Sequence, residues 1–175
     1  MKAYQSLNKQ RGLTLVETLV AVVVGLIILA GAFVVFGMIT SSNKLSNAEQ
    51  DLTTTQLNIK QLYQGQPNYT GLSNAVAFAA NVFPQDMATS AINVIDQWNG
   101  AVTLAADANP TEFDITFAGV PQDACIKFAS FEFGQWVSLT INGTNIPQTQ
   151  GTSPVTVAAT ACVAGPNNAV VWVSG

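Results

Sequence analysis

An unbroken apolar run lies close to the amino terminus and separates two unlike parts of the chain. Residues 1–12 are short, polar and basic, and no residue from Thr18 to Asn43 carries a charge. An apolar stretch of about 20 residues can cross a bilayer as a helix, because a helix satisfies its own backbone hydrogen bonds. The basic flank before the run predicts a cytoplasmic amino terminus. We therefore predict a membrane span over residues 13–39.

Helical periodicity continues beyond the apolar run, and the first proline is Pro67. Leu45, Leu52 and Ile59 recur at the seven-residue spacing of a packed helix, and Ala48 and Leu62 lie at the complementary offset. The other faces are expected to carry the charged residues Lys44, Glu49, Asp51 and Lys60. The pattern predicts one helix over residues 13–63, about 75 Å long at the usual helical rise. Its second half, residues 40–63, is an amphipathic stalk.

The remainder, residues 64–175, alternates between strand patterns and turn residues, which is typical of a globular head. Two runs alternate apolar with polar positions, through Phe113, Ile115 and Phe117 and through Val137, Leu139 and Ile141. Further predictions are a helix over Asn74–Ala80, a turn at Asn99-Gly100 before a strand over Ala101–Ala105, a turn at Asn142-Gly143, and a closing strand over Val170–Val173. The fold class is therefore α+β, with the long helix packed on an antiparallel sheet.

Charge and composition exclude several functions. Three of the six basic residues lie in the first eleven positions, whereas all ten acidic residues follow position 16, so the body is acidic and unsuited to nucleic acid. There is no histidine, and no cluster of nucleophile and base is seen. A calcium site at Asp107, Glu112 and Asp114 is possible, but a solvated strand edge is the favoured interpretation. We predict no catalytic residue, no cofactor and no metal, which argues against the alternative of an anchored periplasmic enzyme.

The two cysteines, Cys125 and Cys162, are too few for a structural zinc site. In an exported domain they indicate one disulfide, which would stabilise the fold by about 4 kcal/mol. Two buried free thiols are the alternative. Periodicity does not decide between helix and strand for the segments that carry them.

Glu17 is unusual for a membrane span, because a carboxylate at the edge of an apolar span costs free energy unless it has a partner. A secretory signal would have a shorter core and a small-residue cleavage site, and a plain single-pass anchor does not explain the acid. Cleavage between Gly12 and Leu13 would supply a partner, since it frees an α-amine on Leu13. We hypothesise that this amine pairs with Glu17 of a neighbouring copy and sets the register between them.

The sequence Arg11-Gly12-Leu13-Thr14-Leu15-Val16-Glu17 resembles the type III signal of type IV prepilins and pseudopilins. The resemblance implies that residues 1–12 are a leader, that prepilin peptidase cuts after Gly12, and that Glu17 acts in assembly. Most members begin their mature chain with Phe. This chain has Leu13 instead, as the type IVb branch commonly does, which leaves its N-methylation open.

The segment Tyr63-x-Gly65-Gln66-x-x-Tyr69-x-Gly71-Leu72 resembles the loop after the long helix in type IVb pilins, such as those of bundle-forming and plasmid-encoded thin pili. By this resemblance the two cysteine segments are short helices, and Cys125 and Cys162 bound a D-region over residues 125–162. The implied function is that of a structural subunit, inserted in the bacterial inner membrane and then polymerised with itself by inner-membrane machinery into a surface fibre for adhesion, aggregation or conjugative contact. The alternative is a pseudopilin of type II secretion.

Overall fold

The computed structural model describes residues 14–131, 134–149, 151 and 153–175, apart from the side chain at position 34. Gly12 and Leu13 therefore lie outside the described residues. The chain divides into two compact units, Met1–Ser42 and Asn43–Gly175.

Helix α1, Leu15–Leu62, supplies the whole described structure of the first unit apart from Thr14. None of the described side chains up to Ser42 is buried, and large apolar residues such as Leu15 (80% exposed) and Phe33 (75% exposed) are open along the helix. By length and composition this helix is capable of crossing a membrane. A helix that is apolar on all sides is stable only where lipid or other protein covers it.

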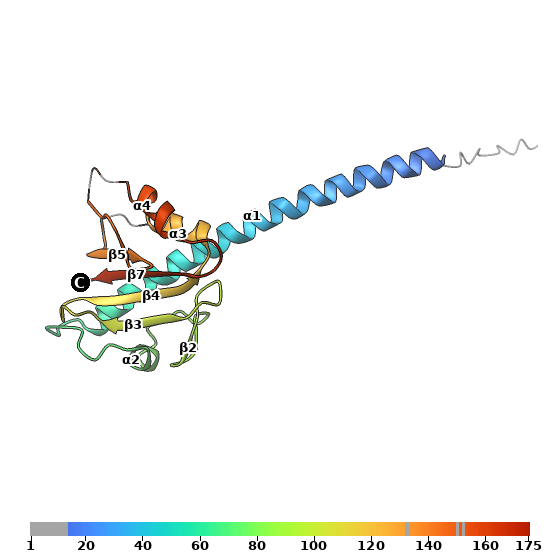
Figure 1. The fold of residues 1–175 in the computed structure, drawn as a ribbon. Helices are drawn as coiled ribbons and strands as arrows, with labels where there is room; N and C mark the ends of the chain where they lie inside the picture. The colour runs from blue at the N-terminus through green and yellow to red at the C-terminus, as the bar shows by residue number, and fades with distance from the viewer. Residues whose placement is uncertain (1–13, 132–133, 150, 152) are drawn as a thin grey trace, which may run out of the picture. The chain divides into compact units, whose positions relative to one another are not determined.

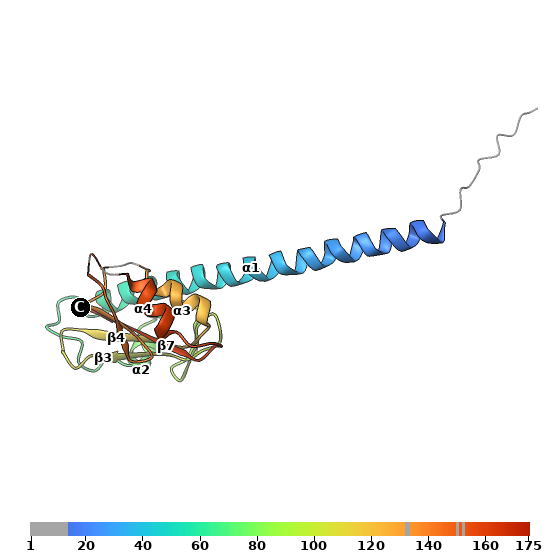
Figure 2. The ribbon, with the colours of Figure 1, turned by 45° about the horizontal axis from the view of Figure 1, so that its top comes forward.

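The second unit consists of a helical layer on a five-stranded antiparallel sheet (Figures 1 and 2). The sheet order is β3-β4-β7-β5-β6, with bounds Val102–Ala106, Phe113–Val120, Asn168–Ser174, Ser138–Ile141 and Thr144–Ile146 respectively. Residues 43–62 of α1 cover one face of this sheet, and the C-terminal strand β7 is its centre. The α+β fold predicted from the sequence, with a long helix on an antiparallel sheet, is confirmed.

The helix face that meets the sheet differs in part from the predicted one. Ala48, Leu52 and Ile59 are fully buried as expected, but Leu62 is 36% exposed, and Asp51, predicted on an outer face, is 8% exposed. The buried stripe consists of Ala48, Asp51, Leu52, Thr55, Gln56, Ile59 and, just past the helix, Tyr63. It follows the helical repeat through polar positions that a count of apolar residues misses. Hydrogen bonds explain this burial: the Asp51 carboxylate accepts from Gln97 at 2.8 Å, and Gln56 donates to Ser174 at 2.8 Å.

Aromatic side chains from β4, β7 and α3 (Gln122–Phe128) form the centre of the core. The ring of Trp172 meets Phe117 at 5.3 Å and Phe128 at 5.0 Å, both edge to face, which is a favoured geometry for aromatic pairs. The predicted alternation along Phe113, Ile115 and Phe117 is confirmed, since these residues are fully buried. The prediction failed at Val137, which precedes β5 and is 54% exposed.

The remaining elements are short. They are α2 (Asn74–Ala79), the β1–β2 hairpin (Ala88–Ser90 and Asn93–Val94) and α4 (Pro154–Ala161). The cysteine segments are thus helices, as the family resemblance implied, with Cys125 inside α3 and Cys162 at the end of α4. At the predicted Asn142-Gly143 turn both residues have positive φ, 52° and 80°, and they join β5 to β6.

Candidate functional site

The predicted processing and assembly site begins outside the described residues, at Gly12 and Leu13, and enters them at Thr14. The hydroxyl of Thr14 accepts a hydrogen bond from the Glu17 amide at 3.3 Å, and the Thr14 carbonyl accepts from the Thr18 amide at 3.1 Å. Thr14 therefore caps α1, and Glu17 lies in the first turn, where a negative charge is favoured by the helix dipole. Our sequence analysis missed this cap, although the Thr-x-x-Glu spacing of a capping box is a signal that could have predicted it.

The loop after α1 explains the paired Tyr-Gly spacing. Tyr69 lies between two rings, 5.2 Å from Tyr63 and 4.7 Å from Phe113, and its amide donates to the Pro110 carbonyl at 2.8 Å. The two glycines of the segment have φ of 85° and 87°, a conformation that side chains disfavour. The loop thus attaches the end of α1 to the start of β4.

The predicted disulfide is present. Cys125 and Cys162 are bonded, with their Cα atoms 6.1 Å apart, and both residues are buried. The bond joins α3 to α4, which lie side by side in both views (Figures 1 and 2). The alternative of two free thiols is therefore wrong.

Two asparagines that sequence reasoning missed form hydrogen bonds with the backbone next to this disulfide. Asn168, fully buried at the start of β7, accepts from the Val163 amide at 2.7 Å and donates to the carbonyls of Val120 and Val163 at 2.9 and 3.0 Å. Asn142 donates to the Ala161 carbonyl and to the Asn168 side chain, both at 2.9 Å. The Asn142-Gly143 turn was the one available sequence signal, and it indicated only the hairpin.

Sequence reasoning also missed a buried carboxylate, Asp96, which stabilises the loop before β3. Asp96 is 5% exposed, and one of its oxygens accepts from the amides of Trp98 and Gly100, both at 2.8 Å. Burial raises the pKa of Asp96, although these two backbone hydrogen bonds lower it in part. Gly100 lies so close to β4 that a Cβ built on it would be 1.5 Å from the Ala118 carbonyl oxygen. The predicted turn is correct, but glycine is required there by contact with a neighbouring strand.

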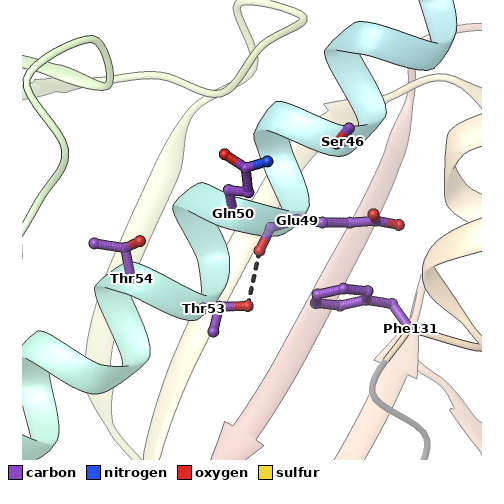
Figure 3. A pocket seen from close by; sticks show the side chains of 6 residues that line it. All are labelled: Ser46, Glu49, Gln50, Thr53, Thr54 and Phe131. Carbon is purple, nitrogen blue, oxygen red and sulfur yellow. Dashed lines mark hydrogen bonds between the residues drawn. The ribbon is translucent and has the colours of Figure 1, made fainter.

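A shallow groove of about 450 Å³ runs along one side of α1 (Figure 3). Its lining is Ser46, Glu49, Gln50, Thr53, Thr54 and Phe131. The Thr53 hydroxyl donates a hydrogen bond to the Glu49 carbonyl at 2.9 Å. Burial raises the pKa of Glu49, and the charge of Lys127 lowers it in part. No hydrogen bond joins a hydroxyl to a base among these lining residues.

The acidic residues considered for calcium lie in the turn between β3 and β4. Asp107 accepts from the Asn109 amide and Glu112 accepts from the Asn109 side chain, both at 2.7 Å. These carboxylates therefore stabilise the turn. Among the described residues, no group of three or more metal-ligating side chains is arranged to hold an ion.

Asp114 follows this turn and is the carboxyl group most affected by its surroundings. The pKa of Asp114 is raised to about 6, mainly by burial and in addition by the Asp107 and Glu112 carboxylates. Because the folded state holds this proton more tightly than the unfolded state, the contribution of Asp114 to stability increases as pH falls from about 6 toward 4.

Replacing Asp114 with Asn is therefore expected to raise the thermal midpoint of the head at pH 7.5, where the buried charge is removed, and to change it little at pH 4. Thermal unfolding of the full chain in detergent, followed by tryptophan fluorescence, measures this effect. All three tryptophans, Trp98, Trp136 and Trp172, lie in the second unit. A midpoint lowered equally at both pH values would contradict the assignment.

Comparisons with known proteins agree with this architecture. A family model described as PilS N terminal matches residues 42–175, and a model of the prokaryotic N-terminal methylation motif matches residues 7–33. The major structural subunit of bundle-forming pilus from Escherichia coli O127:H6 is 23% identical over 128 residues, which are 71% of this chain and 66% of that protein. The protein of the same name from Escherichia coli O111:H- gives the same values. The chain thus spans just under two thirds of these relatives' length.

Two solved structures share the fold. A type IV b pilin from Salmonella typhi has a TM-score of 0.60 at 22% identity, covering 73% of this chain and 97% of that one. TcpA, a type IV pilin from Vibrio cholerae El Tor, has a TM-score of 0.52 at 14% identity, covering 76% and 99% respectively. A long N-terminal helix on an antiparallel sheet, with a disulfide near the C-terminus, is thus the type IV pilin fold. The first family model matches more than half of the chain, so the chain belongs to the PilS family.

Proposed function

We propose that the chain is a structural subunit of a type IV pilus, processed from a precursor and polymerised into a surface fibre. The observation that carries the proposal is that the chain has both a pilin head and a helix whose described residues 15–42 are mostly apolar and include no buried side chain. Such a helix needs lipid before assembly and other helices after it. None of the comparisons favours the pseudopilin alternative.

The proposed division of the chain follows the family pattern. Residues 1–12 are the leader, and prepilin peptidase removes them by cutting between Gly12 and Leu13. Residues 13–39 span the membrane, and residues 40–63 form the stalk. Residues 64–175 form the head, in which residues 125–162 are the D-region. The match to the methylation motif over residues 7–33 supports the position of the cut.

Glu17 is proposed to carry the assembly signal. In the described residues Glu17 is exposed near the start of α1, and no residue from Thr18 to Asn43 carries a charge. An α-amine freed on Leu13 of a neighbouring subunit would neutralise this carboxylate in the low-dielectric centre of a fibre. A contact between different surfaces of successive copies, repeated without closing a ring, generates a filament.

The partners follow from this role. They are further copies of the chain, prepilin peptidase, the inner-membrane pilus assembly machinery, and the membrane itself before assembly. The precursor is placed in the bacterial inner membrane and the mature subunit in an extracellular pilus. The fibre serves contact functions such as adhesion, aggregation or conjugation, and the subunit has no enzymatic role.

Expression in a bacterium that supplies a matching peptidase and assembly machine tests the proposal. We expect antibodies against the head to label thin surface fibres in electron micrographs of cells that express the chain. Cells lacking the chain but carrying the same machine are the control. Labelling confined to the membrane, with the peptidase active on a known prepilin in the same cells, would count against a fibre subunit.

A further inference from the structure

The backbone on both sides of Cys162 is held by side-chain amides from three different elements. Asn142 donates to the carbonyl of Ala161, the residue before Cys162. Asn168 accepts from the amide of Val163, the residue after it, and donates to the Val163 carbonyl. Gln122, at the start of α3, donates to the carbonyl of Cys162 itself at 3.2 Å. Four backbone groups of residues 161–163 are thus held by side-chain hydrogen bonds.

These hydrogen bonds stabilise α4, which is too short to be stable on its own. The helix has eight residues, its N-cap residue Ser153 makes no side-chain capping hydrogen bond, and isolated helices of this length are not stable in water. The last carbonyls of any helix have no partner within it. Here the Ala161 and Cys162 carbonyls find partners in Asn142 and Gln122. The end of α4 is therefore placed by the β5–β6 turn and by α3.

The two asparagines are themselves rigidly held. Asn168 is fully buried, and its side chain accepts from Asn142 at 2.9 Å. The Asn142 amide donates to the Ala169 carbonyl, and its side-chain oxygen accepts from the Ala169 amide, both at 2.9 Å. None of these bonds involves a sulfur atom, so their formation does not require that Cys162 be oxidised.

We propose that Asn142 and Asn168 are positioning residues for the disulfide: they hold Cys162 against Cys125 in the reduced, folded chain, so that oxidation occurs between cysteines already in place. In the reaction with a small disulfide such as oxidised glutathione, one cysteine thiolate attacks it and releases one glutathione thiol. The second cysteine thiolate then attacks the mixed disulfide and releases the other. Two protons and two electrons leave the protein, and one glutathione disulfide becomes two thiols. The proposal concerns the head alone and is independent of the proposed fibre.

The test is the effective concentration of the two thiols for each other, measured at equilibrium in glutathione buffers. The full chain is kept in detergent, thiols are trapped by alkylation, and the oxidised fraction is read from the mass. Asn168→Ala is expected to lower the effective concentration at least about tenfold, because several positioning hydrogen bonds are lost together. Tryptophan fluorescence reports whether the reduced variant remains folded.

Asn74→Ala is the matched control. Its side chain also bridges two backbone groups, accepting from Leu104 at 2.7 Å and donating to Val102 at 2.8 Å, but on β3 at the far edge of the sheet. We expect its effective concentration to stay within about twofold of the parent chain, since no bond near Cys162 is lost.

If Asn168→Ala does not fold, Asn142→Gly decides the question. Glycine adopts the positive φ of 52° at this position without strain, while the bonds to Ala161 and Asn168 disappear. A loss of about threefold or more supports the positioning role. A parent-like effective concentration in the folded asparagine variants, or an equal loss in Asn74→Ala, would overturn it.

Discussion

Replacing Glu17 with Ala is expected to leave the precursor cleaved after Gly12 but to abolish fibres. The physical reason is that the proposed α-amine of Leu13 would enter the fibre centre without a counter-charge, and a lone buried charge costs several kcal/mol. Cleavage is measured by the size of the protein in the membrane fraction. Fibres are measured by electron microscopy and by the amount of protein released on shearing.

The structure adds a control that the sequence did not indicate. Because Glu17 lies in the first turn of α1 next to the Thr14 cap, its replacement by Ala could act by weakening the helix start. Glu17→Gln keeps a side chain suited to a capping box but has no charge. The charge-pair account expects no fibres from either variant. Normal fibres from Glu17→Gln would show that the charge is dispensable.

Replacing Gly100 with Ala is expected to destabilise the head by at least about 3 kcal/mol, because the added Cβ would overlap the backbone of β4. The carbonyl oxygen of Ala118 would be 1.5 Å from it, and the Asp96 carboxylate 2.9 Å. Neither a strand backbone nor a buried carboxylate can move away without breaking its own hydrogen bonds. Urea unfolding of the full chain in detergent, followed by tryptophan fluorescence, gives the change in unfolding free energy.

Gly71→Ala separates this contact from the general loss of a glycine. Gly71 has φ of 87°, yet a Cβ there would meet nothing within 4 Å. For Gly71→Ala only backbone strain is expected, which lowers the unfolding free energy by about 1–2 kcal/mol. Equal losses for the two variants would show that close approach to β4 is not what requires Gly100.

Much of the architecture could be predicted because it depends on simple periodicity. The apolar run, the alternation along Phe113 to Phe117 and the helical repeat of Ala48, Leu52 and Ile59 each reflect a single buried face. The disulfide could be predicted from two cysteines in an exported domain, whereas the two short cysteine helices required the family resemblance, since segments of seven and eight residues are too short for periodicity to decide.

The errors and omissions share a physical cause. Asp51, Gln56 and Asn168 are buried only because a partner distant in the sequence satisfies them: Gln97, Ser174 and, for Asn168, backbone groups of several segments. The residue type alone does not predict such a hydrogen-bond partner. Gly100 was recognised as a turn residue, but its contact with Ala118 arises from how two strands approach each other. The proposed site at Gly12 and Leu13 was predicted from the motif, and it stays a prediction.

The central claim, that this chain is cut after Gly12 and built into a fibre, is tested most directly by the intact mass of protein from sheared surface fibres, measured without reductant. The account predicts the mass of residues 13–175 less two hydrogens for the disulfide, with a further 14 Da if Leu13 is methylated. Full-length protein found only in the membrane fraction, in cells whose peptidase is active, would contradict it.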